Sequence, residues 1–271
     1  METIEEFKKR NVYLTTLSIG DAYTRNFCIK LIDDVLNNSD LKIYITTDVP
    51  EVIEEKFGIH ERVILNKINP NDIKIRLWLN ENRVSSDFNF NLKYLCFDEI
   101  YKDQNSIVIF TDCDNSFEWW NKDEAFSYLH EQYLQGFDFF ASRTDWTFGG
   151  FLSEYNNQTN RQHSIFWHKI FNYDLDKTPK PEWDGASLVA EDILVFINND
   201  DKVRKFYEQW KYLHDYLAVK DFTEGTWAEG FEIGVSAVVA GFKARDLGWN
   251  HHIFRKMFLY NGYKTGYKSG Q

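Results

Sequence analysis

Two aspartates that flank a single residue are the clearest candidates for chemistry in this chain. Asp112 and Asp114 stand on either side of Cys113, directly after the apolar run 107–110. Carboxylate oxygens are the ligands that Mg²⁺ and Mn²⁺ prefer, and two of them leave coordination positions for water and phosphate oxygens. Such a pair also occurs as an ordinary solvated turn, but the apolar run before it favours a divalent-metal site.

Alternating strands and helices have to position this pair. Periodicity and turn residues predict strands at 12–19, 41–47, 62–65, 106–111, 137–142 and 191–197, and helices at 22–36, 52–57, 91–98, 122–135, 201–217 and 229–240. Such alternation is typical of βαβ units in a mostly parallel α/β sheet. Ligands bind at the carboxyl ends of the strands in these sheets, and Asp112 directly follows one strand.

Composition limits the classes of partner. The chain has 271 residues, of which 43% are hydrophobic, so it can bury a large core. Its net charge of -11 provides no overall field that would attract nucleic acid or an anionic membrane surface. Phosphate binding must therefore come from a metal or from a few placed cations.

Cysteine usage and hydropathy indicate the compartment. Cys28, Cys96 and Cys113 are far apart and form no CxxC pair, which fits free thiols better than disulfides or a zinc site. No stretch approaches the roughly 20 apolar residues of a membrane span, and residues 1–10 do not read as a signal peptide. We expect a cytoplasmic protein of a bacterium or of a virus-infected host cell.

The chain resembles the GT-A glycosyltransferases, the nucleotide-diphospho-sugar transferase fold. Four places carry this resemblance: residues 12–17 with 21–25, Lys93 in a helix, the segment 107–114, and the segment 194–198 followed by Phe206, Trp210 and 229–232. It implies one Rossmann-like GT-A domain over residues 1–271, with a mostly parallel central sheet flanked by helices. About 1–115 would bind the nucleotide sugar and about 116–258 the acceptor, and 259–271 would be an irregular tail.

The same resemblance implies roles for individual residues. Asp114 would bind Mn²⁺ or Mg²⁺ directly, and Asp112 would share the metal and orient the donor sugar or ribose. The cation would act as a Lewis acid that neutralises the leaving diphosphate. The residues expected to bind the donor are Thr15, Thr16, Arg25, Lys93, Asp112, Cys113 and Lys256.

The segment 248–256 contains a second group of residues that could bind a metal and a diphosphate. Its adjacent histidines, His251 and His252, are followed by Arg255 and Lys256. Many GT-A enzymes complete the metal shell with a histidine from the C-terminal part of the chain, and a basic residue nearby grips the diphosphate. Adjacent histidines rarely both point at one ion, so we expect one of the two as the third ligand and place His251 ahead of His252. A pair of surface histidines is the alternative.

Carboxylates outside the metal pair are candidates for the catalytic group. An inverting transfer needs a general base near the acceptor hydroxyl, whereas a retaining transfer uses a nearby carboxylate to stabilise positive charge on the sugar. We rank Glu229 first, Glu191 second and Asp192 third. Glu232 would share a helical face with Glu229, whose place at a helix start also suits simple capping.

The resemblance thus implies a metal-dependent hexosyl- or pentosyltransferase that uses a UDP- or GDP-type sugar donor and a hydroxyl acceptor such as a glycan. A viral enzyme of the same fold that glycosylates hydroxymethylated DNA bases is an alternative, disfavoured by the negative charge. The pattern Asp112-x-Asp114-x-Ser116 also fits a haloacid-dehalogenase-type phosphatase with Asp112 as nucleophile. That motif usually lies on the first strand, whereas several strands precede it here. A sugar- or nucleotide-binding protein without catalysis is the third possibility.

Overall fold

A central β-sheet organises the molecule. The computed structural model describes residues 2–69, 78–80, 83–85, 89–98, 100–141, 146–147, 187–189, 192–219, 229–246 and 258–260. Within these residues, seven strands form one sheet in the order β12-β8-β11-β6-β1-β2-β3. Their bounds are β1 Asn11–Ser18, β2 Lys42–Thr47, β3 Val63–Lys67, β6 Ser106–Thr111, β8 Phe139–Ala141, β11 Ile193–Asn198 and β12 Ala244–Asp246.

Most neighbouring strands run parallel. β1 pairs in parallel with β2 and β6, β2 with β3, and β8 with β12. β11 is the exception, because it lies antiparallel between β6 and β8. The predicted α/β architecture with a mostly parallel sheet is therefore confirmed. β6 is central and every one of its residues is buried, which explains its continuous apolar sequence.

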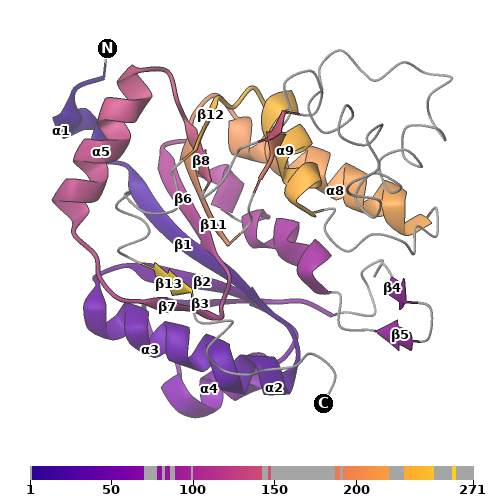
Figure 1. Cartoon of the computed structure of the whole chain (residues 1–271). Helices are drawn as coiled ribbons and strands as arrows, with labels where there is room; N and C mark the ends of the chain where they lie inside the picture. Colours follow the sequence, from indigo (N-terminus) through magenta and orange to yellow (C-terminus); the bar gives the residue numbers. More distant parts are fainter. Residues whose placement is uncertain are drawn as a thin grey trace, which may run out of the picture.

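Helices cover both faces of the sheet. Figure 1 shows α3 and α4 on one side and α8 and α9 on the other. The helices are α1 Ile4–Phe7, α2 Asp21–Tyr23, the π-helix η1 Thr24–Cys28, α3 Ile29–Asn38, α4 Pro50–Phe57, the 3₁₀ helices η3 Asn89–Phe97 and η4 Ile100–Lys102, α5 Lys122–Leu134, α8 Lys202–Val219 and α9 Glu229–Val239. None of the described helices has the length and hydropathy of a membrane span.

The core is divided between these two faces by strand alternation. In β6, Ile107 and Ile109 pack with α3 and α5, whereas Val108 and Phe110 pack with η3, α8 and α9. The second cluster is rich in aromatic rings and includes Trp210, which lies 5.5 Å from Phe206 between ring centroids. Aromatic residues make up 17% of the chain, and many of their rings pack in the core.

Several short elements differ from expectation. The predicted helix at 91–98 is a 3₁₀ helix, η3. Tyr260 and its neighbours, expected at the start of an irregular tail, form β13 Phe258–Tyr260, which pairs antiparallel with β7 Asn115–Phe117. Two more strand pairs join β4 Trp78–Asn80 to β5 Arg83–Ser85, and β9 Trp146–Thr147 to β10 Ser187–Leu188. Residues 261–271 lie outside the described part of the chain.

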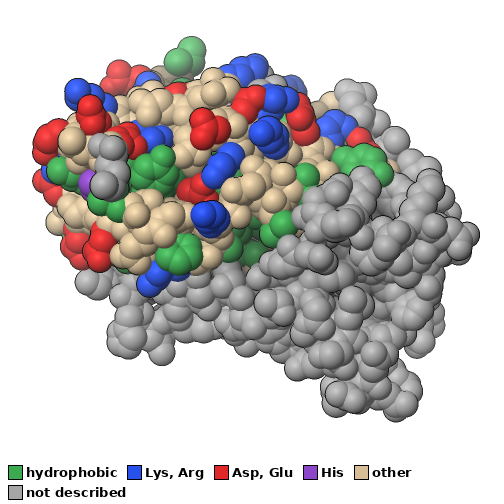
Figure 2. Space-filling view, turned by 90° about the horizontal axis from the view of Figure 1, so that it is seen from above, with side chains coloured by type: hydrophobic (Ala, Val, Ile, Leu, Met, Phe, Trp, Pro, Cys, Tyr) green, Lys and Arg blue, Asp and Glu red, His purple; other side chains and the backbone are tan. Residues whose placement is uncertain are grey.

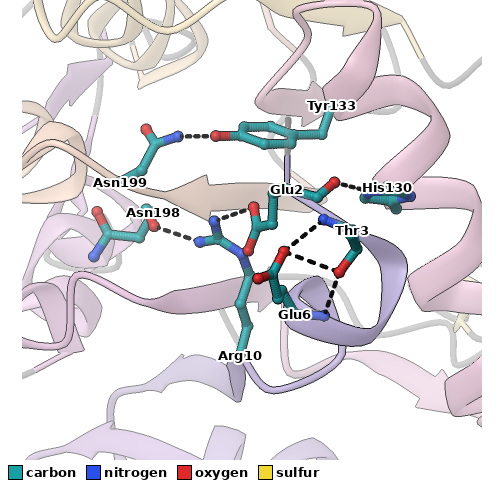
Figure 3. Close-up of polar contacts among 8 residues, drawn as sticks. All are labelled: Glu2, Thr3, Glu6, Arg10, His130, Tyr133, Asn198 and Asn199. Atoms are coloured by element: carbon teal, nitrogen blue, oxygen red, sulfur yellow. Dashed lines mark hydrogen bonds and ion pairs between the residues drawn. The ribbon is translucent and has the colours of Figure 1, made fainter.

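The N-terminal segment is fixed at the edge of the sheet opposite the aspartate pair. The Arg10 guanidinium donates to the carbonyl of Asn198 at 3.0 Å and to the Glu2 carboxylate at 2.9 Å (Figure 3). His130 of α5 lies 2.9 Å from the Glu2 carbonyl oxygen. Asn198 pairs with Ser106 at the beginning of β6, so this cluster supports the fold and lies away from the end that carries Asp112.

The charged surface is mixed. Figure 2 shows acidic and basic side chains interspersed over the described part of one face. Lys8 pairs with Asp123 at 2.9 Å, and Arg204 pairs with Glu208 at 2.7 Å along α8. Exposed pairs of this kind add little stability. On that face the net negative charge is therefore not gathered into one continuous field.

Candidate functional site

The candidate residues meet where three parallel strands have their carboxyl ends, and we call this side of the sheet its ligand edge. β1, β2 and β6 are neighbours, and Ser18, Thr47 and Thr111 end them at this edge. Asp48 follows β2, and its Oδ1 accepts a hydrogen bond from the backbone N–H of Gly20 at 2.8 Å, which fixes the turn after β1. This edge is the ordinary ligand-binding position of an open α/β sheet.

Asp112 and Asp114 lie on a tight turn at this edge. The backbone N–H of Asn115 donates to the carbonyl of Asp112 at 3.2 Å and closes the turn. β7 begins at Asn115 and pairs with β13, so the turn is supported by a strand from the far end of the chain (Figure 1). The expected metal pair is thus held between the central strand β6 and the short ribbon β7–β13.

Lys93 is placed against the first aspartate. Its Nζ lies 2.8 Å from Asp112 Oδ1, and the Lys93 side chain is only 3% exposed whereas that of Asp112 is 20% exposed. The same ammonium lies 5.7 Å from the centre of the Phe110 ring. A buried ammonium needs an anionic partner. The two sequence-predicted residues are therefore brought together, and the expected contact of Lys93 with the donor stays a prediction.

Asp114 is the residue best suited to bind a cation directly. Its Oδ1 is buried and has no hydrogen-bond partner in the part of the chain that the structure describes. Burial raises the pKa of Asp114, and the negative charge of Asp192 raises it further, whereas Lys93 and a backbone N–H act in the opposite direction. A buried carboxylate oxygen without a donor fits direct ligation by a divalent cation.

Asp192 is the expected catalytic carboxylate that the structure brings to this turn. It directly precedes β11, and its carbonyl oxygen accepts hydrogen bonds from the Asp112 backbone N–H at 3.2 Å and from Asn115 Nδ2 at 3.1 Å. The antiparallel direction of β11 produces this contact, because the beginning of β11 then meets the end of β6. Asp192 was ranked below Glu229 and Glu191 from sequence.

The other carboxylates are placed differently. Glu229 begins α9 as predicted, but its side chain lies outside the described part of the structure, as does the whole of Glu191. Glu232 is fully buried and accepts a hydrogen bond from Trp210 Nε1 at 3.0 Å. It therefore holds α9 to α8 within the core.

Cys113 faces the protein interior. Its side chain is buried in the cluster formed with α3 and α5. Burial raises the pKa of the Cys113 thiol, contact with Cys28 raises it further, and a hydrogen bond with Tyr23 lowers it. Asp112 and Asp114, on either side of this buried residue, are only partly buried. The expected contact of Cys113 with the nucleotide-sugar donor would therefore be made by its backbone atoms.

Tyr23 is a residue of this neighbourhood that sequence reasoning missed. Its pKa is raised by burial first, and then by the charges of Cys113, Asp114 and Asp112, so its phenol lies near the aspartate turn. Tyr23 ends α2, in the first turn after β1. Its position after the first strand was the available signal, since that turn faces the ligand edge in these sheets.

The predicted nucleotide-binding residues on the first strand and helix have protein partners. The Thr15 hydroxyl donates to the Cys96 carbonyl at 3.2 Å, and the Thr16 hydroxyl donates to the Thr111 carbonyl at 2.7 Å. Both threonines are fully buried. Arg25 is exposed and pairs with two carboxylates, those of Asp21 and Glu55. These contacts hold the elements around the site, and nucleotide contacts of these residues stay predictions.

The expected third metal ligand lies outside the described residues. This holds for His251 and also for His252, Arg255 and Lys256. Where the structure is described, no group of three or more His, Cys, Asp and Glu side chains is arranged to hold a metal ion. β13 begins shortly after Lys256 and pairs with β7, so the C-terminal part of the chain does reach the strand that follows Asp114.

Comparisons with known proteins give similarity in fold. No protein-family model and no curated protein sequence matches the chain. Mouse xyloside xylosyltransferase 1, in its apo form, aligns with a TM-score of 0.45 at 13% identity, over 88% of this chain and 85% of its own. Core-mannan synthase A from Aspergillus fumigatus, in a Mn/GDP form, aligns with a TM-score of 0.42 at 12% identity, over 92% of this chain and 74% of its own. Both neighbours are glycosyltransferases, the class that the sequence resembles, and the likeness is a distant one.

Proposed function

We propose that the chain is a metal-dependent glycosyltransferase that moves a sugar from a nucleotide-diphosphate donor of UDP or GDP type to a hydroxyl of a glycan. The observation that carries this proposal is the buried Oδ1 of Asp114, which has no hydrogen-bond partner among the described residues. It lies beside the Lys93–Asp112 ion pair at the ligand edge of the sheet. A site of this kind suits a divalent cation better than it suits a second protein side chain.

The residues around the turn have separate tasks in this proposal. Asp114 holds Mn²⁺ or Mg²⁺, with Asp112 and His251 as the further ligands. When bound, the cation supplies Lewis-acid stabilisation of a diphosphate leaving group. Lys93 adds a positive charge on the same side, which holds the Asp112 carboxylate in place and favours an anionic donor.

Asp192 is the carboxylate proposed to act on the acceptor. Its backbone is anchored to the Asp112–Asp114 turn, and its charge acts on Asp114. In an inverting transfer a carboxylate oxygen of Asp192 would take the proton of the acceptor hydroxyl as the new bond forms. In a retaining transfer the same carboxylate would stabilise positive charge on the sugar. Glu229 and Glu191 remain the competing assignments for this role.

A thermal-shift panel tests the proposal. UDP, GDP and their common sugar conjugates are added with and without Mn²⁺ to the wild type, to Asp114→Ala and to Asp123→Ala. Asp123 is an exposed aspartate on α5 and serves as the matched control. A ligand that binds only the folded state adds about 2.7 kcal/mol of stability at a hundredfold excess over its Kd. The melting midpoint rises as a result. We expect a Mn²⁺-dependent rise with one nucleotide in the wild type and in Asp123→Ala.

Two results would count against this function. One is a wild type that no nucleotide stabilises, and the other is an Asp114→Ala protein that responds as the wild type does. Product analysis separates the remaining classes. A transferase cleaves one nucleotide sugar slowly and only with metal, a phosphatase with Asp112 as nucleophile releases phosphate from simple esters, and a binding protein does neither.

A further inference from the structure

We propose that Asn115 is a positioning residue that joins the Asp112–Asp114 turn to Asp192 and thereby sets the affinity of the site for a divalent cation. The inference rests on the proposed function, because it concerns the same metal site. It assigns a role to a side chain that is not among the expected metal ligands or donor-binding residues.

The Asn115 amide joins two strand ends that are far apart in sequence. Asn115 Nδ2 donates to Thr111 Oγ1 at 2.9 Å and to the Asp192 carbonyl oxygen at 3.1 Å. Thr111 is the last residue of β6, and Asp192 directly precedes β11. The Asn115 side chain is 3% exposed, so water cannot readily replace these bonds. A primary amide has two N–H groups, and both are used here.

Several polar groups of the turn lie around the carbonyl oxygen of Asp192. Besides the Asn115 amide, it accepts the backbone N–H of Asp112 at 3.2 Å. The Thr111 hydroxyl lies 3.4 Å from the same oxygen. The backbone contact survives any substitution at position 115, so a variant there removes only the side-chain part of the anchor. The backbone of Asp192 would then be held by fewer bonds and would move more easily.

This anchor opposes a repulsion inside the site. The hydrogen bonds to the Asp192 carbonyl hold this aspartate against the turn that carries Asp112 and Asp114, so carboxylates of like charge are gathered there and repel one another without a cation. Uncharged hydrogen bonds to the backbone are a way to hold them together before a cation arrives. Residues that orient metal ligands in this manner typically change metal affinity by 10–100-fold when they are mutated.

The state of the side-chain oxygen of Asn115 indicates that this residue does more than fill space in the core. Asn115 Oδ1 is buried and has no hydrogen-bond partner among the described residues. Burying an acceptor in this state is unfavourable, and an apolar side chain of similar volume would avoid the penalty. An asparagine is suited to this position because it supplies two donors to Thr111 and Asp192.

Mn²⁺ binding to the full chain tests the role. The free Mn²⁺ signal in electron paramagnetic resonance is followed during titration of the wild type, Asn115→Leu, Asn115→Ser and Asn38→Ala. Leucine keeps the volume but has no donor, whereas serine can keep one. Asn38→Ala is the matched control, because Asn38 Nδ2 donates to the Phe117 carbonyl at 3.0 Å, at the other end of β7.

We expect Asn115→Leu to raise the Kd for Mn²⁺ by about tenfold or more and Asn115→Ser to raise it by a smaller factor. Asn38→Ala should stay within about twofold of the wild type, since its amide lies away from the turn. Far-UV circular dichroism and the melting midpoint without metal show whether each variant is folded. If Asn115→Leu does not fold, the comparison of Asn115→Ser with Asn38→Ala decides, with an expected rise of about threefold for serine.

The outcomes are distinguishable. Folded Asn115 variants that bind Mn²⁺ as tightly as the wild type overturn the positioning role while leaving the proposed function intact. A wild type that does not bind Mn²⁺, or an Asp114→Ala protein that binds it unimpaired, overturns the metal site itself and the inference with it. A higher Kd for Mn²⁺ with an unchanged melting midpoint supports the role, because a purely structural defect would lower the midpoint first.

Discussion

Lys93 and Asp112 form an ion pair at the aspartate turn, and Lys93 is buried. Replacement of Lys93 by methionine keeps much of the side chain but removes the charge, and it leaves the Asp112 carboxylate without its ammonium. Removing one partner of a buried pair costs about 3–5 kcal/mol, and the partial exposure of Asp112 places the expected loss near the lower end. Urea unfolding of Lys93→Met measures this loss in the free energy of unfolding.

The same variant has an expected kinetic result. Hydrolysis of the nucleotide sugar that stabilises the wild type should fall by about tenfold or more, since a site without Lys93 attracts an anionic donor less strongly. Lys8→Met is the control, because Lys8 at the end of α1 pairs with the exposed Asp123 of α5 and not with an aspartate of the turn. A Lys93→Met protein with wild-type stability and turnover would show that the pair contributes to neither.

At the residue scale, sequence patterns found the groups whose chemistry is local. Asp112 and Asp114 were identified from residue type and position, and Lys93 from the resemblance to GT-A glycosyltransferases. The structure places Lys93 against Asp112. Tyr23 and Asn115 were missed because their contacts depend on the fold. The amide of Asn115 reaches a carbonyl 77 residues away in sequence, and no periodicity encodes such a contact.

At the element scale, long apolar strands were predictable and short or reversed ones were not. β1, β2 and β6 are runs of apolar and β-branched residues, which the pleated sheet favours. β7 and β12 have three residues each, too few for a period to be recognised. The antiparallel direction of β11 leaves no mark on its apolar sequence, yet this direction brings Asp192 to the aspartate turn.

Asp103 shows how a loop residue fixes neighbouring elements, and it supports a prediction on pH. Its carboxylate accepts hydrogen bonds from Asn11 Nδ2 at 2.7 Å, from the Tyr13 hydroxyl at 2.8 Å and from the Asn105 backbone N–H at 3.0 Å. Burial acts to raise the pKa of Asp103, but these hydrogen bonds outweigh burial, so the pKa is lowered. The carboxylate thus ties the beginning of β1 to the beginning of β6.

The sign of the pH effect follows from this lowered pKa. A carboxylate with a depressed folded-state pKa stabilises the protein above its unfolded pKa of about 3.9, and the contribution is lost as pH falls through the folded pKa. Asp103→Asn should therefore be less stable than the wild type at pH 7, with a difference that shrinks in acid. Urea unfolding at pH 7 and near pH 3 measures this, with exposed Asp40→Asn as control. An equal difference at both pH values would contradict the assignment.

At the scale of the whole molecule, the two ends of the chain support opposite edges of the sheet. The N-terminal segment is fixed through Arg10 near the beginning of β6, and the C-terminal strand β13 pairs with β7 beyond its end (Figure 1). Composition gave no hint of this arrangement, because β13 lies in a stretch rich in Gly, Tyr and Lys. The strand that follows the aspartate turn is therefore paired with a strand far from it in sequence.

Two truncated chains test whether β13 supports the site. A chain that ends at Tyr260 keeps the strand, and a chain that ends at Met257 loses it. Both retain His251, so a difference between them cannot come from loss of that expected ligand. Without β13, the backbone groups of Asn115, Ser116 and Phe117 lose their antiparallel partners, directly after Asp114.

We expect the chain that ends at Met257 to melt at a lower temperature and to bind Mn²⁺ more weakly than the chain that ends at Tyr260. The physical reason is that β7 fixes one side of the aspartate turn, so a looser β7 lets the two carboxylates separate. Mn²⁺ titration followed by electron paramagnetic resonance, together with thermal melting, measures both effects. Equal Mn²⁺ affinity of the two truncated chains would mean that β6 and the Asp192 carbonyl hold the turn without help from the C-terminal strand.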